Sequence, residues 1–202
     1  MIRIRREDPQ AGALVHRAFS RGGVAVLPTD TLYGFSTALS SRAGHDRIIA
    51  IKGGLPERRF LYLASGADMV ARYIEGWGCA TREIMAAVWP APLTAVFRPG
   101  TGCPVWTGDT IAFRVPADDW LRSTIEGAGE PVLSTSVNEA GNRPLEDPDD
   151  IERLFGARCD LLIDAGRIAA ADPSTLVDFT GSVPLVLRRG AYVWDGEGKP
   201  SN

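Results

Sequence analysis

The amino-acid sequence predicts an α/β (α+β) fold: a twisted, mixed sheet with flanking helices and a concave cavity for a ligand. Two observations support this prediction. Short apolar runs alternate irregularly with segments of helical periodicity, which indicates strands and helices in mixed order. Several of these runs also end in hydroxyl and amide side chains, as buried strands do when they deliver polar groups to one edge of a sheet. The runs are 24–27 before Pro28-Thr29-Asp30-Thr31, Val132-Leu133 before Ser134-Thr135-Ser136-Val137-Asn138, and Ile111-Ala112-Phe113 before Arg114.

Capping and stop signals predict five helices. Asp8-Pro9 is expected to open a helix that ends at Gly22-Gly23. Ser41 is expected to cap a second helix, which ends at Gly53-Gly54 and carries Lys52 at its carboxyl end. The remaining helices are predicted at 65–75, 81–88 and 147–155.

Apolar runs between these helices predict the strands of the sheet. They lie at 24–27, 60–63, 93–97, 111–115, 132–134, 161–163, 174–179 and 185–188. No repeat or flexible linker divides the chain, so residues 1–194 are expected to form one domain without a further carboxyl-terminal domain. Residues 195–202 are polar and contain glycine, which predicts a flexible tail.

Composition and charge exclude several classes of protein. The chain has 202 residues and a net charge of -3, so binding of RNA would need a local concentration of arginine. The three cysteines, Cys79, Cys103 and Cys159, are far apart and have no neighbouring histidine cluster, so we expect neither a disulfide framework nor a resident metal. With no signal sequence and no long apolar stretch, the sequence predicts a cytoplasmic protein that does not enter membranes.

Lys52 is unusual because this chain uses arginine for nearly every positive charge. Of its 22 basic residues, only Lys52 and Lys199 are lysines. A compact ammonium group at position 52 suits a phosphate, although a solvated lysine at a helix end is the alternative.

Six motifs, in this order and spacing, resemble the YrdC-like family of threonylcarbamoyl-AMP synthases. The resemblance extends from about residue 22 to residue 190. The motifs are Pro28-Thr29-Asp30-Thr31-Leu32-Tyr33-Gly34, Lys52, Trp89-Pro90-Ala91-Pro92-Leu93-Thr94, Arg114-Val115-Pro116, Ser134-Thr135-Ser136-Val137-Asn138 and Pro173-Ser174-Thr175.

The resemblance implies an activity. A member of this family would make threonylcarbamoyl-AMP and pyrophosphate from L-threonine, bicarbonate and ATP, with Mg²⁺ accompanying the ATP. The product would serve N6-threonylcarbamoylation of adenosine 37 in tRNA, with a separate transferase acting downstream and tRNA itself as a further partner.

The resemblance also assigns residues to this reaction. It implies Lys52 as the catalytic residue and as a nucleotide contact, together with Thr110, Ser136, Asn138 and Arg188. L-Threonine would be held by Thr31, Arg114, Ser134 and Ser174. The residues themselves leave plainer readings open: Arg114 pairing with an acidic neighbour, Ser136 and Asn138 forming a polar turn, Thr110 and Ser174 capping turns, Arg188 at the surface, and Asp30 capping its own turn.

Two departures from the family pattern fall on the nucleotide side. Gly54 stands where the family usually has arginine, and Arg58 or Arg59 would have to supply the missing charge. Asn138 is followed by Ala140-Gly141 where relatives often have Ser-Gly. These departures keep an alternative open, a divergent YciO-like paralogue that binds RNA or a nucleotide without synthase activity.

Overall fold

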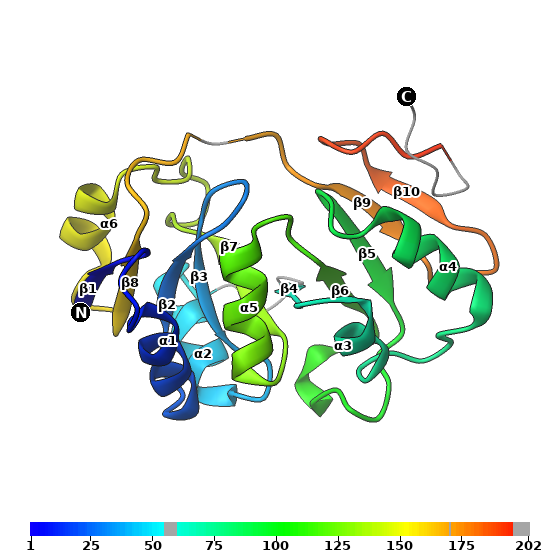
Figure 1. Cartoon of the computed structure of the whole chain (residues 1–202), viewed down its shortest axis with the longest axis horizontal. Coiled ribbons are helices and arrows are strands. Elements are labelled where there is room, and N and C mark those ends of the chain that lie inside the picture. The colour runs from blue at the N-terminus through cyan, green and yellow to red at the C-terminus, as the bar shows by residue number, and fades with distance from the viewer. Residues whose placement is uncertain (55–59, 170, 196–202) are drawn as a thin grey trace.

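The computed structural model describes residues 1–54, 60–169 and 171–195, and its core is a ten-stranded mixed sheet (Figure 1). The strand order is β1-β8-β2-β3-β7-β4-β6-β5-β9-β10. The strands are β1 (Ile2–Arg5), β2 (Ala25–Pro28), β3 (Tyr33–Ala38), β4 (Leu61–Leu63), β5 (Leu93–Phe97), β6 (Ile111–Arg114), β7 (Val132–Ser136), β8 (Leu161–Asp164), β9 (Thr175–Asp178) and β10 (Leu185–Arg188). The prediction of a mixed sheet is therefore confirmed.

The middle of the sheet is antiparallel where β7 pairs with both β3 and β4. Parallel pairs flank it, because β4 pairs with β6, and β8 pairs with β1 and β2. Every β2 and β3 residue is buried, and so are the first three residues of β7. The centre of the sheet is thus part of the hydrophobic core, and it fixes the positions from which the loops after these strands begin.

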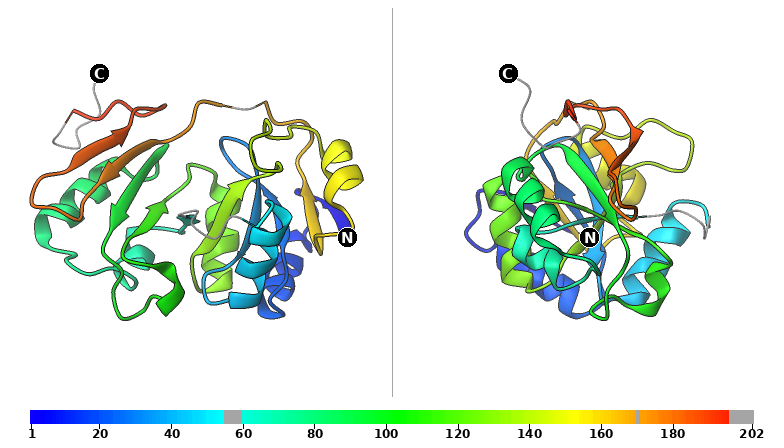
Figure 2. Two further views of the ribbon diagram at one scale, coloured as in Figure 1. Left: turned by 180° about the vertical axis from the view of Figure 1, so that it is seen from behind. Right: turned by 90° about the vertical axis from the view of Figure 1, so that its right-hand side faces the viewer.

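Helices cover both faces of the sheet. Figure 1 shows α1 and α5 in front of the sheet, whereas α2 lies in front of it in the reverse view of Figure 2. The helices are α1 (Ala11–Ser20), α2 (Arg42–Ile51), α3 (Ala67–Ala71), α4 (Cys79–Val88), α5 (Asp119–Ala128) and α6 (Pro148–Phe155), with a 3-10 turn at Val105–Thr107. Among the described helices, none combines the length and apolar character needed to cross a bilayer.

The helix caps confirm part of the sequence prediction. The Ser41 side chain accepts a hydrogen bond from the Gly44 amide and caps α2, and Asp147 caps α6 with Pro148 at its first position. The predicted Asp8 cap is wrong, because Asp8 binds the Gln10 amide in a preceding turn and α1 begins only at Ala11.

Other element predictions also need correction. The helix expected at 65–75 is only Ala67–Ala71, and the helix expected from Thr81 begins at Cys79. Strands β1 and β3 and helix α5 were not predicted. The apolar pattern does not predict strand β3, because this strand buries polar residues and a glycine. Thr37 donates to the Gly23 carbonyl oxygen at 2.9 Å. A Cβ at position 34 would lie 2.6 Å from the Ser134 hydroxyl oxygen, so only glycine fits there.

The segment after β8 crosses from one half of the sheet to the other along the upper edge in Figure 1. Tyr33 anchors its start, since its hydroxyl donates to the Gly166 carbonyl oxygen at 2.7 Å and accepts from the Ala165 amide at 2.9 Å. Burial raises the pKa of Tyr33 to about 12, so this hydroxyl keeps its proton near neutral pH. Further along, the Ala171 amide donates to the Thr31 carbonyl oxygen at 3.1 Å, which ties the segment to the β2–β3 turn.

We predict that Tyr33→Phe destabilises the protein by roughly 1 to 3 kcal/mol, because the Ala165 amide loses its acceptor. Chemical unfolding measures the change. Tyr192→Phe is the matched control: among the described residues its buried hydroxyl has no hydrogen-bond partner, so its removal should cost little. Equal losses in the two variants would contradict the anchor.

Candidate functional site

A cavity of about 430 Å³ gathers six of the predicted site residues. They are Thr31, Arg114, Ser134, Ser136, Ser174 and Arg188. The remaining lining residues are Thr29, Leu32, Phe60, Leu61, Thr135 and Pro173. Sequence positions from 29 to 188 therefore meet in one place, and most of the side chains they bring are hydroxyls or cations.

Strand register explains how these residues meet. Ser134 and Ser136 are two positions apart in β7, so both point to the same face of the sheet. Ser134 lies opposite Leu61 of β4, and Leu61 lies opposite Ala112 of β6. Arg114, two positions beyond Ala112, reaches the same face and completes that side of the cavity.

The turn between β2 and β3 forms another wall. The Thr29 hydroxyl accepts from the Thr31 and Leu32 amides and donates to the Leu32 carbonyl oxygen at 2.7 Å. It also lies 3.1 Å from the Thr31 hydroxyl. Thr29 was not among the predicted site residues, although its place directly after a buried strand, one residue past Pro28, was a usable signal.

Arg114 is a buried cation with an acidic partner. Its side chain is 4% exposed, and its Nη2 donates to the Asp30 carboxylate at 2.9 Å. Burial lowers the pKa of Arg114, and the negative charge of Asp30 opposes that shift. The expectation that Asp30 caps its own turn is wrong, because Thr29 makes those bonds while Asp30 binds Arg114 and the Ala117 amide.

Arg114 keeps hydrogen-bonding capacity for a ligand. A guanidinium has five N–H donors, and the described residues accept one of them. Its Nε atom is buried without a hydrogen-bond partner among those residues. An unsatisfied buried donor is costly, so an anion in this cavity would be stabilised by Arg114.

Ser174 and Arg188 also line the cavity, and Thr94 contacts Ser174 from outside the lining. The Ser174 and Thr94 hydroxyls are 2.7 Å apart, and both residues are buried. Arg188 donates to the Ser174 carbonyl oxygen from Nη2 at 2.8 Å and from Nε at 3.2 Å. Arg188 therefore fixes the start of β9 as well as lining the cavity, and Thr94 supports Ser174 without lining the cavity itself.

Three predicted residues do not line this cavity. Lys52 is only 2% exposed, so the alternative of a solvated lysine is wrong. Its Nζ donates to carbonyl oxygens of Ser136 and Asn138, and Asn138 is itself 8% exposed. Thr110 is half-buried immediately before β6, at the opposite end of that strand from Arg114.

The backbone conformation at position 54 favours glycine over the arginine of the family pattern. Gly53 and Gly54 both adopt positive φ angles, of 89° and 78°, which glycine tolerates and arginine disfavours. A Cβ at position 54 would meet no atom of the described residues within 4 Å, so among them the cost of substitution is conformational. Arg58 and Arg59 lie outside the described residues.

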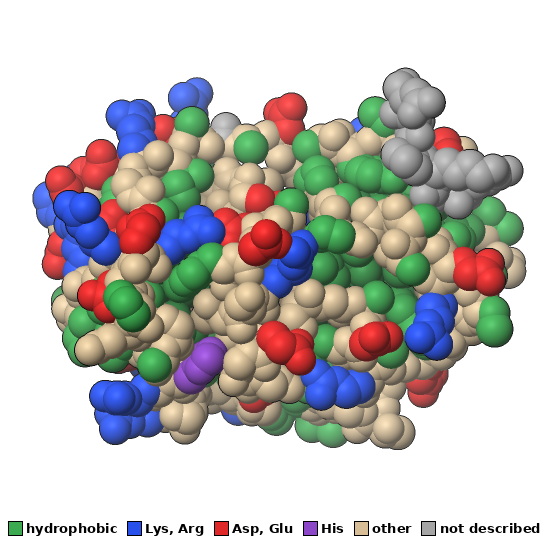
Figure 3. Space-filling view, in the orientation of Figure 1, with side chains coloured by type: hydrophobic (Ala, Val, Ile, Leu, Met, Phe, Trp, Pro, Cys, Tyr) green, Lys and Arg blue, Asp and Glu red, His purple; other side chains and the backbone are tan. Residues whose placement is uncertain are grey.

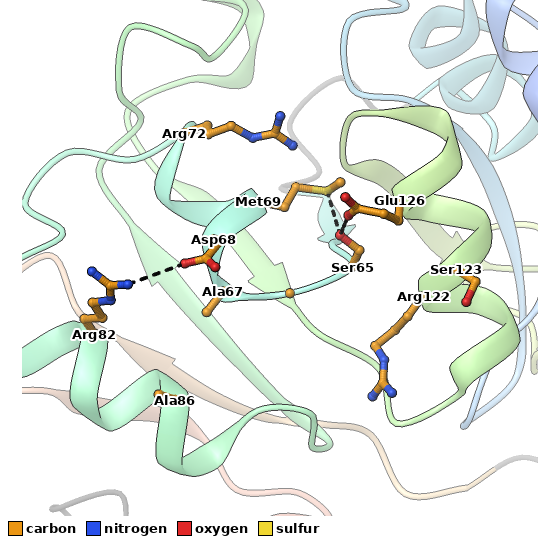
Figure 4. Close-up of a pocket in the computed structure, with 11 residues that line it drawn as sticks. Ser65, Ala67, Asp68, Met69, Arg72, Arg82, Ala86, Arg122, Ser123 and Glu126 are labelled. Carbon is orange, nitrogen blue, oxygen red and sulfur yellow. Dashed lines mark hydrogen bonds and ion pairs between the residues drawn. The ribbon is translucent and has the colours of Figure 1, made fainter.

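A second cavity, of about 780 Å³, lies between α3, α4 and α5 and contains none of the predicted site residues (Figure 4). Its arginines already contact protein acceptors: Arg82 lies 3.9 Å from Asp68, Arg122 pairs with Asp119, and Arg72 donates to the Gly129 carbonyl oxygen at 3.3 Å. The smaller cavity, with its hydroxyls and buried cation, is therefore the better candidate despite its size.

Comparison with known proteins assigns this chain to a family. The model of the Sua5, YciO and YrdC proteins, described as "Telomere recombination", matches residues 17–190. The chain belongs to the Sua5/YciO/YrdC family. The family resemblance expected from the six motifs is thereby confirmed.

Curated members of the family include synthases. The chain is 32% identical over 159 residues to a threonylcarbamoyl-AMP synthase of Halorhodospira halophila, covering 77% of this chain and 82% of that protein. A synthase of the same name from Thiobacillus denitrificans is 32% identical over 183 residues, covering 88% of this chain and 95% of that protein.

Solved structures of family members share the fold. The crystal structure of P. abyssi Sua5 complexed with L-threonine has a TM-score of 0.83 at 23% identity, and the match covers 95% of this chain but only 57% of that one. The crystal structure of E. coli YciO has a TM-score of 0.82 at 25% identity, covering 97% of this chain and 98% of that one.

We predict that Gly54→Arg lowers stability by about 1 to 2 kcal/mol, because a residue with a Cβ is strained at a φ of 78°. Chemical unfolding is the measurement. Gly54→Ala is the matched control and should lose as much, since the strain arises at Cβ and not from the guanidinium. Stabilisation by arginine alone would show that the loop accepts the family residue after all.

Proposed function

We propose that this chain is an L-threonylcarbamoyladenylate synthase, a nucleotidyltransferase that joins L-threonine, bicarbonate and ATP into threonylcarbamoyl-AMP with release of pyrophosphate. The names of the relatives support this proposal: two synthases are 32% identical to the chain over most of its length. The family match over residues 17–190 covers the whole candidate cavity from Thr29 to Arg188.

One structural observation carries the proposal: Arg114 is buried at a cavity that the hydroxyl side chains of Thr31, Ser134, Ser136 and Ser174 also line. An α-carboxylate suits the guanidinium, because planar carboxylate and guanidinium groups form paired hydrogen bonds. Hydroxyls at Thr31, Ser134 and Ser174 then suit a small substrate with a hydroxyl and an amino group. L-Threonine has this set of groups.

The proposed reaction runs in two steps. The amino nitrogen of threonine takes up carbon from bicarbonate to form an N-carboxylate, and water leaves. An oxygen of that carboxylate then bonds to the α-phosphorus of ATP while the bond from this phosphorus to the pyrophosphate oxygen breaks. The attacking carboxylate is anionic and the leaving oxygen becomes so as its bond to phosphorus breaks, so the protein contributes positioning and charge neutralisation and supplies no nucleophile.

The nucleotide would lie on the Ser136 side of the cavity, with Arg188 as a further contact. Thr110 lies at the other end of β6 from Arg114 and does not line this cavity. Mg²⁺ is expected to accompany ATP, because this ion usually binds nucleotide phosphates through few protein ligands. Such an ion is bound mainly by phosphate oxygens and water, where it neutralises charge.

Further expectations concern partners and location. We propose that the product passes to a separate transferase that modifies adenosine 37 of tRNA. Figure 3 shows positive and negative side chains interspersed over the face of the molecule seen in Figure 1. We propose that tRNA is attracted by the cavity cations Arg114 and Arg188. All three cysteines are free, which fits the proposed reducing cytoplasm.

Pyrophosphate release in the presence of ATP, Mg²⁺ and bicarbonate tests the function. We predict release that depends on L-threonine, is weaker with L-serine, and falls on the order of 100-fold in Arg114→Gln, which removes the buried cation. Arg122→Gln is the matched control, because Arg122 lines the other cavity, and it should leave the rate unchanged.

The contrary result is a folded protein without threonine-dependent release. In that case tRNA binding with steep dependence on salt would support the YciO-like binding module instead.

A further inference from the structure

Lys52 approaches the site from the face of the sheet opposite the one that carries Ser134 and Ser136. Phe35 of β3 lies opposite Thr135 of β7, so its ring points away from the face that carries Ser134 and Ser136. The Lys52 Nζ lies 5.9 Å from the centre of that ring. Its helix, α2, covers this far face, as Figures 1 and 2 show.

The ammonium group of Lys52 binds the turn that follows β7. Nζ donates to the Ser136 carbonyl oxygen at 2.7 Å, to the Asn138 carbonyl oxygen at 3.1 Å and to Asn138 Oδ1 at 2.8 Å. An ammonium has three N–H donors, and these acceptors match that number. Direct contact with a phosphate would require Lys52 to leave at least one of them.

Asn138 is engaged in the same way. Its Oδ1 accepts from the Ser136 hydroxyl at 2.6 Å as well as from Lys52, and its Nδ2 donates to the Asn142 carbonyl oxygen at 2.6 Å. Both of its side-chain polar atoms therefore bind protein. Of these three residues, only Ser136 lines the cavity.

We propose that Lys52 and Asn138 are positioning residues, which hold the Ser136 turn against the nucleotide and do not themselves contact its phosphates. The proposal rests on the proposed function, because it concerns the nucleotide side of that site. It differs from the roles that the family resemblance implies for Lys52 and Asn138, and it follows from three hydrogen bonds and the face of the sheet that Lys52 occupies.

The number of phosphates in the ligand distinguishes a Lys52 that contacts phosphate from a Lys52 that only positions the Ser136 turn. A lysine that touches the β- or γ-phosphate strengthens ATP binding far more than AMP binding, because AMP lacks those groups. Loss of a lysine that only holds the turn weakens binding of AMP and ATP alike, because the displaced Ser136 faces both ligands. Lysine-to-arginine replacement also discriminates, because arginine keeps the charge but its planar fork does not reproduce three donors around one nitrogen.

Calorimetric titration of AMP and of ATP with Mg²⁺ into the full chain tests the proposal. We expect Lys52→Ala and Lys52→Arg each to weaken binding of AMP and of ATP by roughly 10-fold or more. For each variant, the losses for the two ligands should agree within about twofold. In a Ser136→Ala background, Lys52→Ala should add little, because the group it positions is gone. Asn138→Ala gives the same readings should the Lys52 variants fail to fold.

A loss at least 10-fold greater for ATP than for AMP, or binding of ATP restored by Lys52→Arg, would overturn the positioning role and leave the proposed function standing. Failure of the wild-type chain to bind either nucleotide would overturn both proposals.

Discussion

Strand β7 imposes the constraint on which the site depends. It lies between β3 and β4 in the middle of the sheet, and its alternation turns Ser134 and Ser136 toward the cavity while Leu133 enters the core. A shift of one residue in its register would turn Ser134 and Ser136 away from the cavity and place Leu133 on that face instead. Leu133 has no exposed surface, so burial of this side chain opposes such a shift.

The same strand connects the two faces of the sheet chemically. Ser136 presents its hydroxyl on the cavity side, and its carbonyl oxygen accepts from Lys52, which arrives with α2 from the other side. The folding of α2 and the shape of the nucleotide side are therefore coupled. On the amino-acid side, Asp30 plays a comparable part, because its carboxylate fixes one edge of the Arg114 guanidinium and partly offsets the cost of burying it.

Much of this arrangement could be predicted from the sequence. Polar residues directly after apolar runs identified Thr31, Ser134 and Arg114, because a strand delivers its last residues to the sheet edge, and all three line the cavity. The turn at Gly22 after α1, where the φ angle is positive, and the Ser41 cap of α2 also follow from local chemistry.

What could not be predicted depends on contacts distant in sequence. Strand β3 contains Gly34 and Thr37, which look like loop residues until Ser134 and Gly23 are placed beside them. The pairing of Asp30 with Arg114 joins residues 84 positions apart, and neither residue alone shows that partner. Lys52 was identified as special, but the sequence does not show that its acceptors are Ser136 and Asn138.

A crystal structure of the chain with L-threonine and a non-hydrolysable ATP analogue tests the central claim most directly, namely that the cavity bounded by Arg114 and Ser136 is the reaction site. We predict the threonine carboxylate on Arg114 and the nucleotide phosphates beside Ser136, with Lys52 still bound to the turn. Ligands in the larger cavity between α3, α4 and α5, with the Arg114 cavity empty, would contradict the account.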